Sequence, residues 1–320
     1  SAAMDTVTES RMAISLAEAG GIGIIHKNNS IDSQAAEVRA VKKYESGIVR
    51  DPVTINSQKT IGELRQLTSE LSISGMPVVD DGNLRGIVTG RDFRYAENME
   101  AKVATIMTPL SKLVTVKEGF SQEDVMKLMY KNRIEKVLVI GEDDALTGLV
   151  TMKDIEKSAQ HPDATKDTSG RLQVGAALGT GVDTLDRAQA LYESGVDVYV
   201  IDSAHAHSKN VIDTIKKIKS TFKDIDVIGG NIATSEAALE LVKAGADAVK
   251  VGMGPGSICT TRIIAGIGVP QISAILDIKN ALKKTDINII ADGGIRFSGD
   301  IAKAIAAGAD SVMLGSLFAG

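Results

Sequence analysis

The strongest constraint on the fold is a unit that recurs along the chain, a helix that ends at glycine and is followed at once by a short apolar strand. The unit is clear at residues 18–26, 193–202, 243–252 and 306–315, which read EAGGIGIIH, ESGVDVYVID, KAGADAVKVG and AAGADSVMLG. Glycine just after the last helical turn closes a helix in the left-handed conformation. A continuous apolar strand is typical of a parallel sheet that is covered on both faces. The repeat therefore predicts the α/β class, with helices and parallel strands in alternation.

Counting the strand ends extends this prediction to a closed architecture. The apolar segments are SAAMD at residues 1–5, followed by GIGIIH, QVGAAL, VYVID, VIGGN, AVKVG, IIADGG and VMLGS, which makes eight. Eight units of this kind predict a TIM (β/α)8 barrel, in which functional residues lie at the carboxyl ends of the strands. The loops after the seventh and eighth strands, ADGGIRFSGD and LGSLFAG, offer glycine amides to an anion such as a phosphate.

A different repeat interrupts the barrel pattern. Residues 51–93 resemble residues 112–155 with an offset of 61 to 62 residues, so the segment is an internal duplication. Each copy predicts strand, helix, strand, acidic turn, strand and a final helix that opens near Thr-x-x-Asp. One copy is too small to bury its own sheet face well, so we expect the two to pack as a pair. The predicted domains are barrel residues 1–47, an insert at 48–157 with copies at about 48–95 and 108–157, and barrel residues 158–320.

Composition excludes several classes of partner. The net charge is −5 with both signs mixed along the chain, aromatic residues make up 3%, and tryptophan is absent. These values argue against a nucleic-acid surface, which needs a basic field or stacking aromatics. The apolar runs are far shorter than the roughly 20 residues of a membrane span. We therefore expect no nucleic-acid or membrane partners. The chain has one cysteine, which cannot form an internal disulfide, so we expect a cytoplasmic protein.

That single cysteine, Cys259, lies in the glycine-rich stretch VGMGPGSICTTR at residues 251–262. A lone cysteine is commonly a small buried apolar side chain, and that alternative stands. A glycine loop at the carboxyl end of a barrel strand is instead a place for chemistry. Its amides and Arg262 would supply positive potential, which lowers a thiol pKa and produces a nucleophile. We therefore expect Cys259 to be catalytic.

The duplicated insert resembles a CBS-domain pair, or Bateman domain, because both copies end in G-[IL]-V-T-x-x-D. The barrel resembles the IMP dehydrogenase / GMP reductase family across nearly the whole chain, in SAAMDTVTE, GGIGIIHKN, GGNIAT, VKVGMGPGSICTTRI, GVPQ, IADGGIRFSGD and MLGSLFAG. The first resemblance implies that adenine or guanine nucleotides bind between the copies, near Thr89, Asp92, Thr151 and Asp154. The alternative is that Asp92 and Asp154 only cap their helices.

The second resemblance implies NAD-dependent oxidation of inosine 5′-monophosphate (IMP) to xanthosine 5′-monophosphate, a step of guanine nucleotide biosynthesis. Cys259 would add to carbon 2 of the purine, hydride would pass to NAD, and water would hydrolyse the thioimidate. Thr261 would assist the water step, or it is an ordinary loop hydroxyl. Two alternatives remain, a GMP reductase that uses NADPH and a nucleotide-sensing scaffold with an inactive barrel. The CBS pair and RIIAGIGVPQ favour the dehydrogenase.

The same resemblance implies the binding residues. IMP would contact Met4, Ser257, Asp292, Gly293, Gly294, Gly315 and Ser316, although Met4 is alternatively a core residue. NAD would contact Asp202, Ser203, Asn231, Gly252, Met253 and Gly254. A potassium ion would be held by the carbonyl oxygens of Gly254, Gly256 and Cys259. His205 and His207 are not assigned as bases or metal ligands, because no cluster of carboxylates and cysteines completes a site with them.

The resemblance also implies features beyond this sequence. In the family, a complete first strand, a mobile flap after the eighth strand and a closing helix accompany the barrel. The flap carries the arginine and tyrosine that activate water, so we expect the chain as written to stall at the covalent intermediate. The family forms tetramers, so we expect a homotetramer or a larger assembly.

Overall fold

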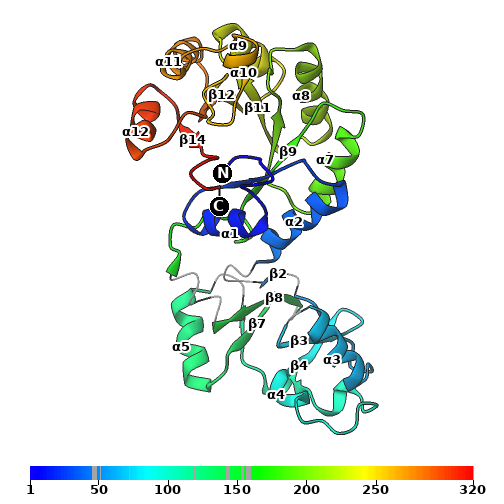
Figure 1. Cartoon of the computed structure of the whole chain (residues 1–320). Helices are drawn as coiled ribbons and strands as arrows, with labels where there is room; N and C mark the ends of the chain where they lie inside the picture. The colour runs from blue at the N-terminus through cyan, green and yellow to red at the C-terminus, as the bar shows by residue number, and fades with distance from the viewer. Residues whose placement is uncertain are drawn as a thin grey trace. The chain divides into compact units, whose positions relative to one another are not determined.

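The chain divides into two units that are interleaved in sequence (Figure 1). Unit 1 comprises Ser1–Tyr44, Asp163–Thr168 and Leu172–Gly320, and unit 2 comprises Glu45–Pro162 and Ser169–Arg171. The computed structural model describes residues 1–44, 49–50, 52–71, 73–117, 120–141, 145–152, 155 and 160–319. No helix among these residues is both long enough and apolar enough to cross a membrane.

Unit 1 is built on a parallel sheet whose strands follow one another in chain order, β1-β9-β10-β11-β12-β13-β14. All six neighbouring pairs are parallel, and the sheet curls as it does in barrel folds of this class. Seven of the eight predicted strands are thus confirmed. Their bounds are β1 Gly23–Ile25, β9 Val174–Leu178, β10 Val198–Asp202, β11 Asp226–Ile232, β12 Ala248–Val251, β13 Asn288–Asp292 and β14 Ser311–Met313.

Helices connect these strands and cover the outer face of the sheet (Figure 1). The glycines that end the repeated helices, Gly20, Gly195, Gly245 and Gly308, all have the positive φ that the sequence predicts. The helices of unit 1 are α1 Ser10–Glu18, α2 Ile31–Lys43, α7 Thr184–Glu193, α8 Lys209–Thr221, α9 Ser235–Lys243, α10 Thr261–Ile264, α11 Gln271–Ala281 and α12 Ser298–Ala306.

The predicted strand SAAMD at residues 1–5 is wrong as a strand, although its first two residues are hydrogen-bonded on both sides. The amide of Ala2 donates to Leu314 O beyond β14 (2.9 Å), and the amide of Ile24 in β1 donates to Ser1 O (3.4 Å). The chain then turns, because the amides of Val7 and Thr8 both donate to the Met4 carbonyl (3.0 and 2.9 Å). This local turn takes the backbone groups that a longer ladder would need.

An aspartate just before the strand in three of the repeats ties each strand to its neighbour. Its carboxylate accepts the main-chain N–H of the first or second residue of the adjacent strand, so the starts of the two strands are held in register. The pairs are Asp197 with Val174 (2.8 Å), Asp247 with Val227 (2.7 Å) and Asp310 with Ile289 (2.8 Å). The GxD spacing of the repeat therefore has a structural role.

The part of unit 2 that the structure describes forms two small sheets. One has the order β2-β8-β7-β6 and the other β3-β4-β5. The strands are β2 Val49–Arg50, β3 Gly75–Asp80, β4 Asn83–Thr89, β5 Thr108–Pro109, β6 Thr115–Lys117, β7 Lys136–Ile140 and β8 Leu146–Thr151. The helices among the described residues of unit 2 are α3 Ile61–Glu70, α4 Gly90–Phe93 and α5 Gln122–Asn132, with 3₁₀ turns η1 Val103–Thr105 and η2 Leu110–Lys112.

The two copies of unit 2 depend on each other. Each copy has a helix followed by an antiparallel hairpin, α3-β3-β4 and α5-β7-β8. Strand β2, at the start of the first copy, pairs with β8 of the second, and β5, at the start of the second copy, pairs with β4 of the first. Side chains from both copies form a shared apolar cluster, which contains Leu84, Ile87, Leu138, Ile140 and Leu149. The paired packing predicted from the duplication is therefore present.

Candidate active site

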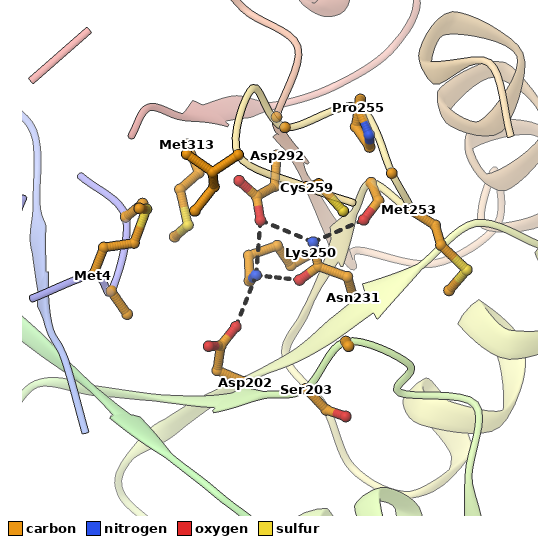
Figure 2. A pocket seen from close by; sticks show the side chains of 18 of the residues that line it. Met4, Asp202, Ser203, Asn231, Lys250, Met253, Pro255, Cys259, Asp292 and Met313 are labelled. Carbon is orange, nitrogen blue, oxygen red and sulfur yellow. Dashed lines mark hydrogen bonds and ion pairs between the residues drawn. The ribbon is translucent and has the colours of Figure 1, made fainter. Parts of the chain in front are cut away.

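A cavity of about 320 Å³ lies at the carboxyl ends of the parallel strands of unit 1, the end at which barrel chemistry is expected. Figure 2 shows side chains from strands β10 to β14 and from the glycine-rich loop after β12 gathered around it. Most of the predicted site residues line this cavity: Met4, Asp202, Ser203, Asn231, Gly252, Met253, Gly254, Gly256, Cys259, Thr261, Asp292 and Gly293.

Cys259 lies on the loop after β12, where a tight turn closes with its amide donating to Gly256 O (3.0 Å). Its Sγ lies 3.2 Å from Thr261 Oγ1. The hydroxyl and the amide of Thr261, and to a smaller extent the amide of Gly254 and the charge of Arg262, hold the pKa of the Cys259 thiol below its ordinary value. The half-exposed thiol is therefore prepared to act as a nucleophile.

The loop requires glycine where it leaves the sheet. A Cβ on Gly252 would overlap the main-chain oxygen of Asp292 on the neighbouring strand. Gln271 fixes the same point, because its Nε2 donates to Val251 O (2.8 Å) and to Asp292 O (3.2 Å). These contacts hold the Cys259 loop beside the carboxyl end of β13.

Lys250 in β12 lies at the centre of the polar side of the cavity, between residues of three other strands (Figure 2). Only 3% of its surface is exposed. Its Nζ donates to Asp292 Oδ2 (2.9 Å), to Asp202 Oδ1 (3.1 Å) and to Asn231 Oδ1. Burial lowers the pKa of the Lys250 ammonium, but the carboxylates of Asp292 and Asp202 outweigh it and raise that pKa above its ordinary value. Lys250 is therefore a fixed cation at neutral pH.

The sequence analysis missed Lys250, although a signal for it exists. It is the one charged residue in the strand AVKV, and alternation places it on the same face as Ala248. Ala248 packs in the inner apolar cluster with Val200 and Ile228. An inward lysine in a buried strand must have acceptors, since an unpaired buried charge is very costly.

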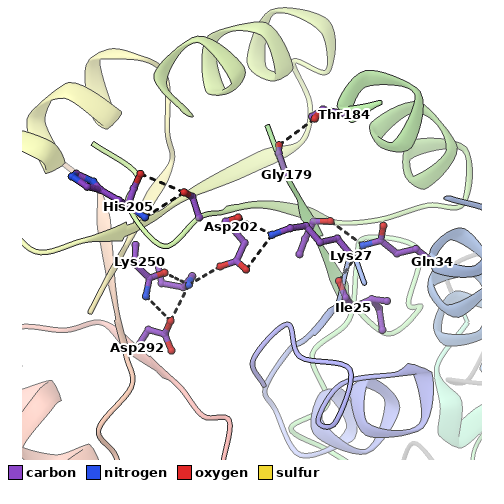
Figure 3. A network of polar contacts seen from close by, with 12 residues as sticks. Ile25, Lys27, Gln34, Gly179, Thr184, Asp202, His205, Lys250 and Asp292 are labelled. Carbon is purple, nitrogen blue, oxygen red and sulfur yellow. Dashed lines mark hydrogen bonds and ion pairs between the residues drawn. The ribbon is translucent and has the colours of Figure 1, made fainter. Parts of the chain in front are cut away.

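Asp202 ends β10 and lies between two lysines, as Figure 3 shows. Lys27 Nζ donates to the Asp202 carbonyl oxygen (2.8 Å) and lies 3.5 Å from Oδ2, while Lys250 holds Oδ1. Burial raises the pKa of the Asp202 carboxyl, but the two ammonium groups outweigh burial and hold it below its ordinary value. Asp202 is therefore ionised at neutral pH. Lys27 was also missed by the sequence analysis.

Asp292 and Asn231 complete the polar cluster. Asn231 Nδ2 donates to Asp292 Oδ2 (2.9 Å) and to Gly252 O (2.8 Å). Asp292 Oδ2 thus accepts from Asn231 and Lys250, while no described group donates to Oδ1. One oxygen of this carboxylate remains available to accept hydrogen bonds from a ligand's hydroxyl groups.

Four predicted site residues do not line the cavity. A Cβ on Gly294 would lie 3.2 Å from Pro255 Cβ, and one on Gly315 would lie 3.2 Å from Met4 Sδ, so both glycines border the site. Ser257 and Ser316 are exposed on the neighbouring loops.

The two histidines after β10 have other surroundings. His205 is exposed, and His207 Nε2 lies 3.3 Å from Glu240 Oε2. In the described part of the chain, no three His, Cys, Asp or Glu side chains group as a metal site.

The predicted regulatory residues belong to unit 2. Thr89 and Asp92 border a cavity of about 460 Å³ that is lined from both copies and includes the cations Arg91, Arg94, Lys112 and Lys136. Asp92 Oδ2 caps α4, because the amide and hydroxyl of Thr89 donate to it (2.7 and 2.8 Å). Thr151 is buried at the end of β8. Asp154 lies outside the described residues.

Comparison with known proteins places these observations in a family. A family model described as IMP dehydrogenase / GMP reductase domain matches residues 1–320. The chain is 55% identical over 321 residues to inosine-5′-monophosphate dehydrogenase of Pasteurella multocida and 54% identical to that of Escherichia coli. These alignments cover 100% of the chain, which spans 66% of the length of each relative.

Solved structures of similar fold are GMP reductases of Trypanosoma brucei. A variant in complex with guanosine 5′-monophosphate has a TM-score of 0.86 and 42% identity, covering 100% of this chain and 68% of that one. A structure in complex with guanosine 5′-triphosphate has a TM-score of 0.85 and 42% identity, covering 99% of this chain and 77% of that one.

Proposed function

The chain belongs to the IMP dehydrogenase / GMP reductase family, and from this premise we propose that it carries the site for NAD-dependent oxidation of IMP to xanthosine 5′-monophosphate. The observation that carries the proposal is the thiol of Cys259. Its pKa is lowered by neighbouring donors, and it lines the same cavity as the half-free carboxylate of Asp292. The relatives named above are dehydrogenases, which supports oxidation as the reaction.

The covalent step belongs to Cys259. Its thiolate adds to carbon 2 of the purine, and loss of hydride from that carbon leaves a thioimidate. Water then attacks carbon 2, with Thr261 next to the sulfur to assist the proton transfer, and the thiol leaves as xanthosine 5′-monophosphate forms. Bound NAD supplies the hydride acceptor.

The nucleotide would lie between Met4 and the loop of Cys259. Its ribose hydroxyls would donate to Asp292 Oδ1, which no described group occupies. Its phosphate would meet Ser257, Gly293, Gly294, Gly315 and Ser316.

The cofactor would occupy the Asp202 side of the cavity, with Ser203, Asn231, Gly252, Met253 and Gly254. An ionised carboxylate at Asp202 fits ribose hydroxyls, because it is purely an acceptor. Carbonyl oxygens are suitable donors for a potassium ion, and Gly254, Gly256 and Cys259 would supply three of them; Gly256 O also closes the Cys259 turn.

Intact-protein mass spectrometry after incubation with IMP and NAD tests the proposal. We expect the mass of one nucleotide to be added, and Cys259→Ala, as the control, to abolish the addition. Absence of the adduct, with no NADH formed, would contradict the proposal.

GMP reductase activity is a second candidate, because the structural neighbours named above carry that name. Incubation with guanosine 5′-monophosphate and NADPH, followed by an assay for released ammonia, distinguishes the two reactions. Ammonia release without NADH formation from IMP would favour the reductase. If neither ammonia nor NADH forms but a nucleotide binds to unit 2, the result would favour the scaffold with an inactive barrel.

We also propose that unit 2 is a tandem CBS domain that binds an adenine or guanine nucleotide in its 460 Å³ cavity. The cations lining that cavity suit a phosphate, and Asp92 retains Oδ1 beside its capping contact. Isothermal titration with ATP and GTP should detect binding that Asp92→Ala weakens. No heat with either nucleotide would exclude this role.

The remaining proposals concern architecture. The bonds of Ser1 and Ala2 to β1 and to Leu314 support a TIM barrel in which the N-terminal segment closes the gap between β14 and β1. We also propose a homotetramer or larger assembly, on the basis of the family resemblance, and a cytoplasmic location, which the single cysteine supports.

A further inference from the structure

The polar cluster around Lys250 joins the two halves of the proposed site through one ammonium group. Lys250 Nζ contacts Asp292 at the end of β13 and Asp202 at the end of β10, as well as Asn231 in β11 (Figures 2 and 3). In the proposed function, Asp292 accepts from the nucleotide and Asp202 accepts from the dinucleotide. The same buried cation is therefore the partner of both carboxylates.

In the proposed function, each carboxylate would present its remaining oxygen to a different ligand. Asp292 uses Oδ2 for Lys250 and Asn231, which leaves Oδ1. Asp202 uses Oδ1 for Lys250, and Lys27 lies at a longer 3.5 Å from Oδ2. The orientation of each available oxygen thus depends on the position of Lys250 Nζ.

The fold holds the stem of Lys250 close to the neighbouring strand. Gly230 lies beside it in β11, and a Cβ on Gly230 would come within 2.5 Å of Lys250 Cβ. A buried ammonium that has three acceptors and a raised pKa stays charged, so it is not a proton donor or acceptor in the reaction. Its remaining role is to orient other groups.

We propose that Lys250 is a positioning residue that makes binding of the nucleotide and binding of the dinucleotide cooperative. This inference rests on the proposed function. The first ligand fixes one carboxylate and, through Lys250, orders the other, so the second ligand meets a site that is already ordered. Such coupling is reciprocal, because each ligand must raise the affinity of the other by the same factor.

Equilibrium binding to the full chain in a Cys259→Ala background measures this coupling without turnover. The dissociation constant of NAD is determined with and without saturating IMP, and that of IMP with and without NAD. We expect each ligand to tighten the other by a factor within the usual range of about 5 to 150. In Lys250→Met this factor should fall to about one, and in Lys250→Arg, which keeps the charge, it should be partly restored.

Lys27→Met is the matched control, because Lys27 contacts Asp202 and has no bond to Asp292 among those described. This variant should weaken NAD binding and retain most of the coupling. The dissociation constant of IMP measured without NAD should stay the same. Lys250→Met with weakened affinities but an unchanged coupling factor would overturn the inference, since that is the result of a purely structural role.

A second measurement needs no substitution at Lys250. The 2′,3′-dideoxy analogue of IMP lacks the hydroxyl groups that would donate to Asp292, so it should bind without raising the affinity for NAD. Full coupling with this analogue would overturn the inference. If both natural ligands bind without any coupling, this inference is contradicted and the proposed function is not. If neither ligand binds, the proposed function is contradicted as well.

Discussion

At the scale of single residues, the reactivity of Cys259 depends on its donors. The hydroxyl and amide of Thr261 are the main causes of its lowered pKa, and they outweigh burial of the half-exposed thiol, which raises that pKa. The hydroxyl lies two residues away on the same loop, 3.2 Å from the sulfur. A local contact therefore sets the fraction of thiolate at neutral pH.

Thr261→Val should raise the pKa of Cys259, because it removes the hydroxyl and keeps the side-chain shape. A higher pKa means less thiolate at neutral pH, so alkylation by iodoacetamide should slow several-fold at pH 7 and recover at alkaline pH. The pH profile of the alkylation rate measures this. Thr260→Val is the control, since the exposed Thr260 side chain has no described contact with the sulfur. Equal profiles for the two variants would refute the assignment.

Gly230→Ala should destabilise unit 1, because its Cβ would lie within 2.9 Å of both the Cβ and the main-chain oxygen of Lys250. Overpacking of this kind costs about 1–3 kcal/mol. Gly299→Ala is the matched control, since a Cβ there meets nothing within 4 Å and the residue lies in α12. Urea unfolding should show a lowered midpoint for the first variant and a raised or equal midpoint for the second. The reverse order would contradict this account.

At the scale of elements, the repeated aspartates bind main-chain N–H groups near the starts of neighbouring strands, as capping residues bind those at the start of a helix. Each carboxylate accepts an N–H at the start of the adjacent strand and also pairs with a lysine. The lysines are Lys42 with Asp197 (2.8 Å), Lys219 with Asp247 (2.8 Å) and Lys279 with Asp310 (3.4 Å). The repeat thus fixes strand register at the end of the sheet opposite the active-site cavity.

Asp247→Ala should lower the free energy of unfolding of unit 1 by about 1–3 kcal/mol, since it leaves the Val227 amide without its acceptor. Asp286→Ala, at an exposed position with no described bond, should change little. Chemical denaturation of both variants provides the comparison. A similar loss in both would mean that the strand contact contributes nothing specific.

At the scale of the whole molecule, each unit has apolar clusters of its own. Among the described residues, two clusters belong to unit 1, one on each face of its sheet, and three belong to unit 2. In unit 2, two clusters lie one in each copy and the third is shared between them. Each unit is therefore stabilised by apolar packing of its own, while the two copies of unit 2 stabilise each other through the shared cluster.

Leu138→Ala should lower the unfolding temperature of unit 2 and leave that of unit 1 unchanged. Leu138 is 1% exposed in the shared cluster, and truncation of a buried leucine costs about 2–5 kcal/mol. Calorimetry should show one transition moved to lower temperature and the other unmoved. Adduct formation at Cys259 serves as the control for an intact barrel unit. A shift of both transitions would show that the units unfold as one.

The sequence by itself determined the α/β class, seven of the parallel strands and the glycine ends of the helices, because each depends on a pattern of a few neighbouring residues. It also singled out Cys259 and Thr261, whose contact is local. Only the tertiary structure decided the polar cluster. Lys250 meets Asp202 and Asp292 across 48 and 42 residues, and Lys27 meets Asp202 across 175. Such pairs depend on which strands are neighbours and on their register, which long-range packing fixes. The turn after Ala2 likewise overrode the apolar pattern of SAAMD, because its backbone bonds compete with strand pairing.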